Sequence, residues 1–241
     1  MQFNSRTYIM IMIMIAGISL MYFTYSNVDT TIGKHLPIEE QKIIEKYHID
    51  NFNNTHDNVF FDIAIGVKNI GRVEIELFDE EVPITCKNFR YLCSQDNSKL
   101  NYVDSIFHRV LSGYLIQGGD IINYDGTSGY SAYGQYFKDE NYELKHNQEG
   151  LLAMANCGKD KNNSQFLILT RKGGYSELDD KYVVFGIIVK GYDIVKKIEN
   201  SKINKEFKPI RECRIIDCGI VKADEEIEVD DDCDETVKLS I

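Results

Sequence analysis

Three things that the sequence lacks exclude whole classes of function. It has no cluster of lysine and arginine residues that would follow a phosphate backbone, so we expect no nucleic-acid binding. Its six cysteines form no C-x-x-C pair and its five histidines are scattered, so neither a metal site nor a disulfide framework is predicted. There is no internal repeat, and the glycine-rich stretch at residues 125–134 does not lead from a strand into a helix, as a phosphate-binding loop does. The chain is therefore predicted to act without a metal or another cofactor.

What the sequence does have is enough apolar material for one domain, together with an uneven charge. The chain has 241 residues, of which 43% are hydrophobic and 27% charged, as in an ordinary globular protein. The formal net charge is −11, and nine of the twelve residues at 224–235 are acidic. We therefore predict a solvated acidic tail at residues 223–241, with binding of a basic partner or Ca²⁺ as the alternative.

An uncharged run at residues 8–25 predicts a membrane-directed N-terminus. As a helix it would be about 27 Å long, close to the hydrocarbon thickness of a bilayer. Arg6 precedes the run, which favours a cytosolic N-terminus, and aromatic residues lie at both of its ends. We predict a signal anchor or transmembrane helix at residues 1–25 and a tether at residues 26–57. The body of this single-pass protein would then lie in the secretory-pathway lumen or outside the cell.

The alternative for the same run is a cleaved signal peptide and a secreted protein. No good cleavage site follows the run, so we favour the uncleaved anchor. Glycosylation sequons at Asn53 and Asn162 give weak support for a luminal or extracellular body.

Residues 58–222 have the pattern of one mainly β domain. Short apolar stretches separated by turn residues predict strands at residues 59–65, 73–77, 106–111, 114–116, 151–156, 165–170, 182–189 and 213–221, with a turn at 69–71. Helical patterns predict two helices, at residues 83–93 and 192–200. This content indicates an eight-stranded antiparallel closed barrel capped by two α-helices.

The stretch at residues 107–120 contains the first candidate functional residue. It reads as two short strands joined at Ser112-Gly113, and because side chains alternate along a strand, Arg109 is expected to share a face with Phe107 and Leu111. A guanidinium among large apolar neighbours is costly to desolvate unless its hydrogen bonds are accepted. The acceptor is either a structural carboxylate or the carbonyl of a bound ligand, and this stretch alone leaves both open.

A series of short motifs then identifies a family. The chain resembles the cyclophilins, the prolyl cis/trans isomerases also called rotamases, in order from about residue 59 to residue 221. The motifs are Phe60-Phe61-Asp62-Ile63, Gly71-Arg72-Val73, Glu76-Leu77-Phe78, Val82-Pro83, Asn88-Phe89, Phe107-His108-Arg109-Val110, Gln117-Gly118-Gly119-Asp120, Gly126-Thr127, Tyr133-Gly134, Phe137 with Asp139-Glu140-Asn141, Met154-Ala155-Asn156, Asn163-Ser164-Gln165-Phe166 and Val183-Val184-Phe185-Gly186. Each motif is weak alone, but the series is specific, and it implies the same two-helix, eight-stranded barrel.

The resemblance also implies a role for individual residues. Arg109 looks like the family's catalytic hydrogen-bond donor to the twisted proline amide, and Gln117 like the glutamine that holds the substrate or orients that arginine. The backbone of Asn156 matches the position that hydrogen-bonds the substrate chain. The matching segments imply that the remaining substrate-binding pocket is formed by Tyr114, Leu115, Ala155, Gln165, Phe166, Leu167 and Tyr182.

Departures from the family pattern concentrate in the pocket. The family usually has Phe, Met and Phe where this chain has Tyr114, Leu115 and Leu167. Glu177 stands at the position of the family's Trp, although two extra residues in that loop could bring Tyr175 into its place. Tyr182 replaces a His. Because the family contacts cyclosporin-type ligands through that Trp, we expect such ligands to bind weakly here.

The sequence therefore predicts a peptidyl-prolyl cis-trans isomerase that acts on X-Pro bonds in polypeptides and assists protein folding. The alternative is a cyclophilin-fold module that binds proline-containing peptides but turns them over poorly. Its expected partners are proline-containing polypeptides and, through the N-terminal helix, a membrane.

Overall fold

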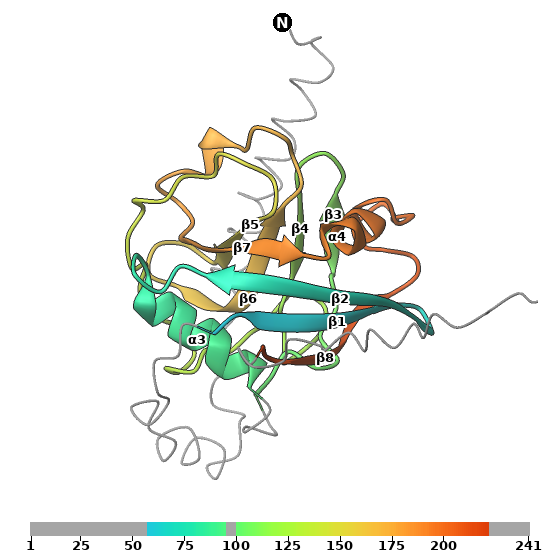
Figure 1. The fold of residues 1–241 in the computed structure, drawn as a ribbon, viewed down its shortest axis with the longest axis horizontal. Coiled ribbons are helices and arrows are strands. Elements are labelled where there is room, and N and C mark those ends of the chain that lie inside the picture. The colour runs from blue at the N-terminus through green and yellow to red at the C-terminus, as the bar shows by residue number, and fades with distance from the viewer. Residues whose placement is uncertain (1–56, 95–99, 222–241) are drawn as a thin grey trace, which may run out of the picture.

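The computed structural model describes residues 57–94 and 100–221 (Figure 1). The predicted anchor at residues 1–25, almost all of the predicted tether at 26–57 and the predicted tail at 223–241 lie outside the described residues, so they stay predictions. Within the described ranges, no helix is both long enough and apolar enough to cross a membrane.

The described part of the chain is mainly β, with eight antiparallel strands curled into a half-barrel. The strands are β1 Val59–Ile65, β2 Lys68–Leu77, β3 Arg109–Leu111, β4 Leu115–Gly118, β5 Leu151–Asn156, β6 Asn162–Leu169, β7 Val184–Lys190 and β8 Cys213–Ile220. They form one sheet in the order β3-β4-β6-β5-β7-β2-β1-β8. The two α-helices of this part are α3 Pro83–Cys93 and α4 Tyr192–Glu199, which lie at opposite ends of the barrel (Figure 1).

Most predicted elements occur at their expected positions, and the main local error is one turn. β1, β5 and α3 have the predicted bounds. The first hairpin turns at Gly66-Val67, however, and the predicted turn at residues 69–71 lies inside β2. Gly66 has φ +61°, a conformation that hairpin turns need and that glycine adopts without strain.

The prediction of a closed barrel is not confirmed. β3 and β8 are the two edges of the sheet and form no ladder with each other within the described ranges. The chain just before β3 does reach β8, because the Phe107 N–H donates to the Cys213 carbonyl at 2.9 Å and Ile106 pairs with Arg214 as an isolated bridge. The edges are therefore joined by an irregular segment, and β3 is shorter than the predicted strand at 106–111.

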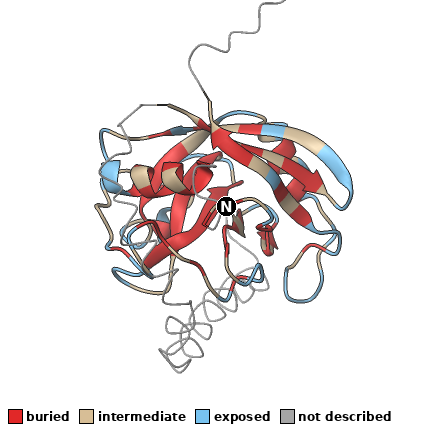
Figure 2. Cartoon of the chain, turned by 90° about the horizontal axis from the view of Figure 1, so that it is seen from below, coloured by how far each residue is buried: buried red, intermediate tan, exposed pale blue. Residues whose placement is uncertain are grey.

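The interior of the half-barrel is filled by aromatic rings. Phe61, Phe89, Tyr102, Phe107 and Phe166 are all almost fully buried, and the rings of Phe89 and Tyr102 lie with centroids 5.0 Å apart. Helix α3 contacts β1, β6, β7 and β8, whereas α4 contacts β2, β3 and β4. Buried residues accordingly run along the strands (Figure 2), and both helices bury one side, as Phe89 does in α3 and Val195 in α4. This core fixes one face of every strand and leaves the other face of β3, β4, β6 and β5 for a site.

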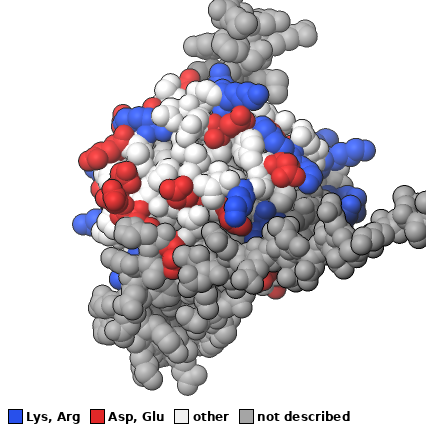
Figure 3. Space-filling view, viewed as in Figure 1, with Lys and Arg blue, Asp and Glu red and all other residues white. Residues whose placement is uncertain are grey.

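The surface carries both signs of charge. Lysine, arginine, aspartate and glutamate are interspersed on the face shown in Figure 3. Some of them pair across neighbouring strands, as Arg72 does with Asp62 at 2.8 Å and Lys190 with Glu74 at 3.0 Å. Such exposed ion pairs contribute little to stability, so they do not explain why the chain adopts this fold.

Two kinds of side chain are notable for their burial, the cysteines and the asparagine of the second sequon. Four of the five cysteines in the described part, Cys86, Cys93, Cys213 and Cys218, are buried free thiols, and the fifth is half-buried. Asn162 of the second sequon is also buried, and its Nδ2 donates to Phe137 O and Asp139 Oδ1. A glycan on this buried, hydrogen-bonded amide would not fit into the folded domain, so the Asn162 sequon does not support a luminal location.

Candidate active site

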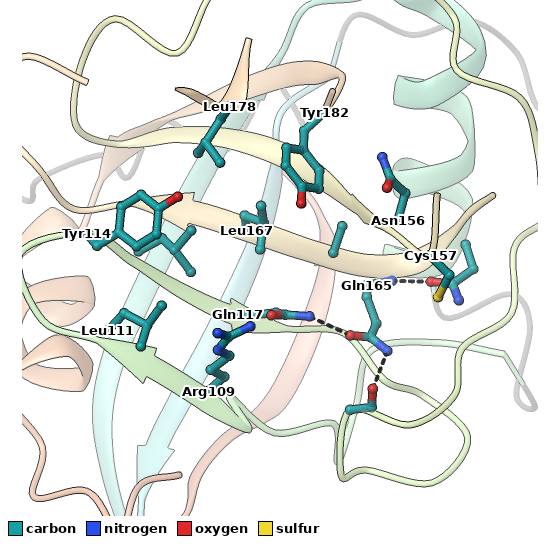
Figure 4. A pocket seen from close by; sticks show the side chains of 14 residues that line it. Arg109, Leu111, Tyr114, Gln117, Asn156, Cys157, Gln165, Leu167, Leu178 and Tyr182 are labelled. Atoms are coloured by element: carbon teal, nitrogen blue, oxygen red, sulfur yellow. Dashed lines mark hydrogen bonds between the residues drawn. The ribbon is translucent and has the colours of Figure 1, made fainter. Parts of the chain in front are cut away.

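One pocket opens on the outer face of the sheet, over the strands β3, β4, β6 and β5 (Figure 4). Nine of the ten predicted site residues line it. Its lining consists of Arg109, Leu111, Tyr114, Leu115, Gln117, Gly126, Ala155, Asn156, Cys157, Asn163, Gln165, Leu167, Leu178 and Tyr182. Residues that the sequence places over 70 positions apart are thus brought to one cavity, while their catalytic and binding roles stay predictions.

The register of the sheet explains why the central residues meet. Arg109 on β3 is paired with Gln117 on β4, and Gln117 is paired with Leu167 on β6. Neighbouring strands lie about 4.8 Å apart, so the three side chains stand in one row across the pocket floor. The predicted pairing of the arginine with an adjoining glutamine is therefore a property of the strand register.

Phe166 is the one predicted pocket residue that is wrongly placed. Its side chain is fully buried on the opposite side of β6, where its ring lies 5.6 Å from the ring of Phe61 and 5.5 Å from that of Phe89. Side chains alternate along a strand, so when Gln165 and Leu167 face the pocket, Phe166 must face the core.

Phe107 is misplaced for a related reason. We expected it to share a face with Arg109, but β3 begins only at Arg109, and the irregular chain before it turns Phe107 into the core against Phe166. Arg109 therefore shares its face with Leu111 alone.

Arg109 is a largely buried cation that points into the pocket (Figure 4). Its guanidinium makes no hydrogen bond or ion pair with any residue of the described part of the chain. Burial lowers the pKa of Arg109, while the nearby phenols of Tyr182 and Tyr114 act in the opposite direction. An arginine keeps its proton in a protein, so these donors stay available to a ligand. The structural-carboxylate alternative left open by the sequence has no support within the described residues.

A chain of amide hydrogen bonds fixes the polar side of the pocket. Gln117 Nε2 donates to Gln165 Oε1 at 2.8 Å. Gln165 Nε2 donates in turn to the carbonyl oxygens of Gly126 at 3.0 Å and Ser128 at 2.6 Å. Both amides are therefore oriented before any ligand arrives, which is the condition for binding without a reorganisation cost.

The loop that contains Gly126 is itself held by one carboxylate. Asp120 accepts backbone N–H groups of Ile122, Asn123, Gly126 and Ser128 at 2.9 to 3.1 Å. Burial acts to raise the pKa of Asp120, but these hydrogen bonds outweigh it, and the pKa is lowered below its usual value. Asp120 thus stays ionised and anchors the loop that orients Gln165.

The opposite wall of the pocket comes from the loop between β6 and β7. Leu178 and Tyr182 lie across the pocket from Arg109 in Figure 4. The ring of Tyr175 packs against the ring of Tyr114 at a tilt of 53°, with centroids 4.1 Å apart, whereas the side chain of Glu177 is exposed. Tyr175 itself does not line the pocket, so its place at the position of the family's Trp stays a prediction.

Five pocket residues were missed from the sequence. Leu111 was expected to share a face with Arg109 but was not counted as a site residue, and Asn163 lies two positions from Gln165 on β6, so strand alternation would have found it. Gly126, Cys157 and Leu178 come from loops, and no periodicity predicts where a loop side chain lies. No group of three His, Cys, Asp or Glu residues in the described ranges is arranged to hold a metal ion.

Comparisons with known proteins agree with this geometry. The family model described as "Cyclophilin type peptidyl-prolyl cis-trans isomerase/CLD" matches residues 60–220. A peptidyl-prolyl cis-trans isomerase of Encephalitozoon cuniculi is 44% identical over 169 residues, which cover 68% of this chain and 94% of that protein. The NK-tumor recognition proteins of mouse and human are each 44% identical over 168 residues, 67% of this chain but only 11% of their own length. The chain thus spans about a tenth of those two relatives.

Proposed function

Because the chain belongs to the cyclophilin-type peptidyl-prolyl cis-trans isomerases, we propose that it catalyses the rotation of X-Pro bonds in polypeptides and so assists their folding. The observation that carries this proposal is the guanidinium of Arg109, which is largely buried, faces a pocket and has no acceptor among the described residues. Desolvating such a group is costly unless a ligand accepts its hydrogen bonds. The carbonyl and nitrogen of a bound X-Pro amide are acceptors of the right kind.

The reaction needs only a positioned donor. Rotating a peptide bond costs about 18–20 kcal/mol because the conjugation between nitrogen and carbonyl is broken. In the twisted transition state the proline nitrogen becomes pyramidal and basic, so a donor aimed at it stabilises the transition state more than the planar ground state. Arg109 can donate without losing its proton, and the buried setting strengthens its interaction with a partial negative charge.

The rest of the pocket suits the residues on the two sides of an X-Pro bond. The proline ring would lie over the apolar side chains of Leu115 and Leu167, next to Arg109. The backbone of Asn156 would hydrogen-bond the substrate chain, since the Asn156 side chain already donates to the Lys181 carbonyl at 2.7 Å. Gln117 would hold the substrate carbonyl from the β4 side.

The test is an X-Pro isomerisation assay on the full-length chain in non-ionic detergent. We expect the wild type to exceed the uncatalysed rate and Arg109→Ala to lower kcat/KM about 10²- to 10³-fold, the usual cost of removing one transition-state donor. Arg72→Ala is the matched control, because Arg72 is an exposed arginine paired with Asp62 on the surface. A wild type no faster than the uncatalysed reaction refutes the enzyme, and equal rates for wild type and Arg109→Ala refute the role of the arginine.

A second candidate function is a proline-peptide binding module with little turnover. It is favoured by Leu167, which stands where the family has an aromatic ring, and by the exposed side chain of Glu177 at the position of the family's Trp. The same features lead us to propose weak binding of cyclosporin-type ligands. A peptide that binds with a measurable Kd but isomerises at the uncatalysed rate would favour this function over the first.

We also propose that residues 8–25 anchor the protein in a membrane with its body on the luminal or extracellular side. The support is the length of the uncharged run and the arginine that precedes it. Resistance of the body to added protease in intact microsomes is the expected result. Its digestion in intact vesicles would refute this topology, and a shorter mature chain without the run would favour secretion.

A further inference from the structure

The loop between β6 and β7 forms the pocket wall that faces Arg109. Leu178 and Tyr182 line the pocket from this loop, and the ring of Tyr175 packs against that of Tyr114. Only a short 3₁₀ turn at Ser176–Leu178 is regular within it. The position of the wall must therefore be fixed by contacts to another part of the chain.

Those contacts converge on His146, a residue that the pocket itself does not include. Asp179 Oδ1 accepts the backbone N–H of His146 at 2.9 Å and lies 2.8 Å from its ring Nδ1. The Tyr175 N–H donates to the His146 carbonyl at 2.5 Å. The same residue is therefore bonded to the loop on both sides of Leu178.

The loop between β6 and β7 lies unusually close to the backbone of His146 at one glycine. A Cβ added at Gly174 would lie 1.9 Å from the His146 carbonyl oxygen, and Gly174 has φ +69°. No residue with a side chain fits there without moving one segment away from the other. The close contact is what lets the neighbouring Tyr175 N–H reach the carbonyl.

The ring of His146 is fixed in one protonation state by its surroundings. Its side chain is fully buried, and Nε2 has no hydrogen-bond partner among the described residues. Since Asp179 can only accept, Nδ1 carries a proton, and burial lowers the pKa of His146, which favours the neutral ring with Nε2 unprotonated. The charged groups around the ring are Asp179 from the loop and Lys145 from its own segment. Among the described residues, the ring of His146 therefore donates one hydrogen bond, from Nδ1 to Asp179.

We propose that His146 and Asp179 are positioning residues for substrate binding, which hold Leu178 and the Tyr114–Tyr175 ring pair against the pocket. This inference rests on the proposed function, since it assigns the pair to the affinity of the proposed site for proline peptides. Neither residue lines the pocket, and the pair is distinct from Arg109, to which the proposed function assigns the rotating bond. Loss of the hydrogen bonds between His146 and Asp179 is expected to weaken substrate binding, while a bound substrate still contacts the Arg109 guanidinium.

The test compares three variants of the full-length chain with wild type. Asp179→Ala removes both hydrogen bonds to His146 and should raise KM for an X-Pro peptide about tenfold, while kcat falls less than twofold. Asp179→Asn keeps an oxygen that can accept both bonds, so its KM should stay within about threefold of wild type. Lys145→Ala is the matched control: it removes the neighbouring link from Lys145 Nζ to Asp180 Oδ1, which joins the same two segments but is exposed, and its KM should not change.

A second measurement does not depend on the catalytic activity of the protein. The methyl groups of Leu178 lie beside the aromatic rings of the wall, so their NMR shifts report its position without substrate. These shifts should move in Asp179→Ala and stay in Lys145→Ala. Unchanged Leu178 shifts, or an unchanged KM in a folded Asp179→Ala variant, overturn the inference. If the wild type turns over no substrate, the proposed isomerase fails, and the Leu178 shifts still decide whether the pair positions the wall.

Discussion

Truncation of Phe166 should destabilise the domain and leave the pocket unchanged. Phe166 is fully buried, and its ring contacts those of Phe61, Phe89, Tyr102 and Phe107 at centroid distances of 5.5 to 6.0 Å. Phe→Ala substitutions in cores cost about 3–5 kcal/mol, and each favourable ring pair adds about 0.5–1.5 kcal/mol beyond burial. We therefore expect a loss near 5 kcal/mol for Phe166→Ala. Because whole domains are stable by only about 5–15 kcal/mol, that variant risks unfolding.

Phe166→Leu is the informative form of the experiment. Leucine keeps most of the apolar volume and loses the ring contacts, so the expected cost is about 2 kcal/mol. For a domain of this size that loss lowers Tm by roughly 4–8 °C. Guanidinium unfolding and thermal unfolding measure the stability, and KM for an X-Pro peptide, taken well below Tm, measures the pocket. KM should equal that of wild type.

The adjacent residue supplies the matched comparison. Leu167 faces the pocket, so Leu167→Ala should raise KM and cost less stability than a substitution in the closed core. A Phe166→Leu variant that raised KM with an unfolding free energy within 0.5 kcal/mol of wild type would refute the assignment of alternate β6 residues to the two faces.

Three further outcomes are expected. Leu167→Phe should lower KM for proline peptides and tighten binding of cyclosporin, as measured by calorimetry; unchanged affinities would show that this side chain does not limit binding. Gln165→Leu removes the amide that donates to Gly126 and Ser128, and should cost about 1–3 kcal/mol in urea unfolding and raise KM; an unchanged KM would contradict the role of the amide chain. Burial lowers the pKa of His108 from 6.5 to about 4, so the folded state favours the neutral ring, and stability should fall by up to about 3 kcal/mol as pH drops from 6.5 through 4. Denaturation of wild type and His108→Asn at pH 7 and pH 4.5 checks this, and the same pH dependence in both would contradict it.

The sequence predicted the fold well where apolar stretches are bounded by turn residues. The bounds of β1, β5 and α3 were correct because glycine, proline or polar residues end each of those patterns. The first turn was wrong because Asn69 and Gly71 resemble turn residues, whereas the hairpin uses Gly66. Two plausible turn signals within six residues cannot be ranked without the pairing of β1 with β2.

The site could be predicted on the strands and not on the loops. Arg109, Gln117 and Leu167 lie at register positions of one sheet, so strand pairing was enough to bring them together. Phe166 was misplaced because a resemblance between segments identifies a stretch of chain and not the direction of each side chain. Alternation along β6 would have corrected it, since Gln165 was already assigned to the pocket.

The two sides of the pocket are therefore built by different means, and this suggests where the chain can vary. The side with Arg109 is fixed by ladders between β3, β4 and β6, where moving one residue would reverse the faces of a whole strand. The facing wall depends on a few hydrogen bonds to His146, so its loop can change length and side chains without altering the sheet. Tyr175 of this loop packs against Tyr114, while Arg109 keeps its place on β3. Differences in substrate affinity are then expected to arise from the wall, and the rate of rotation of a bound X-Pro peptide from the sheet.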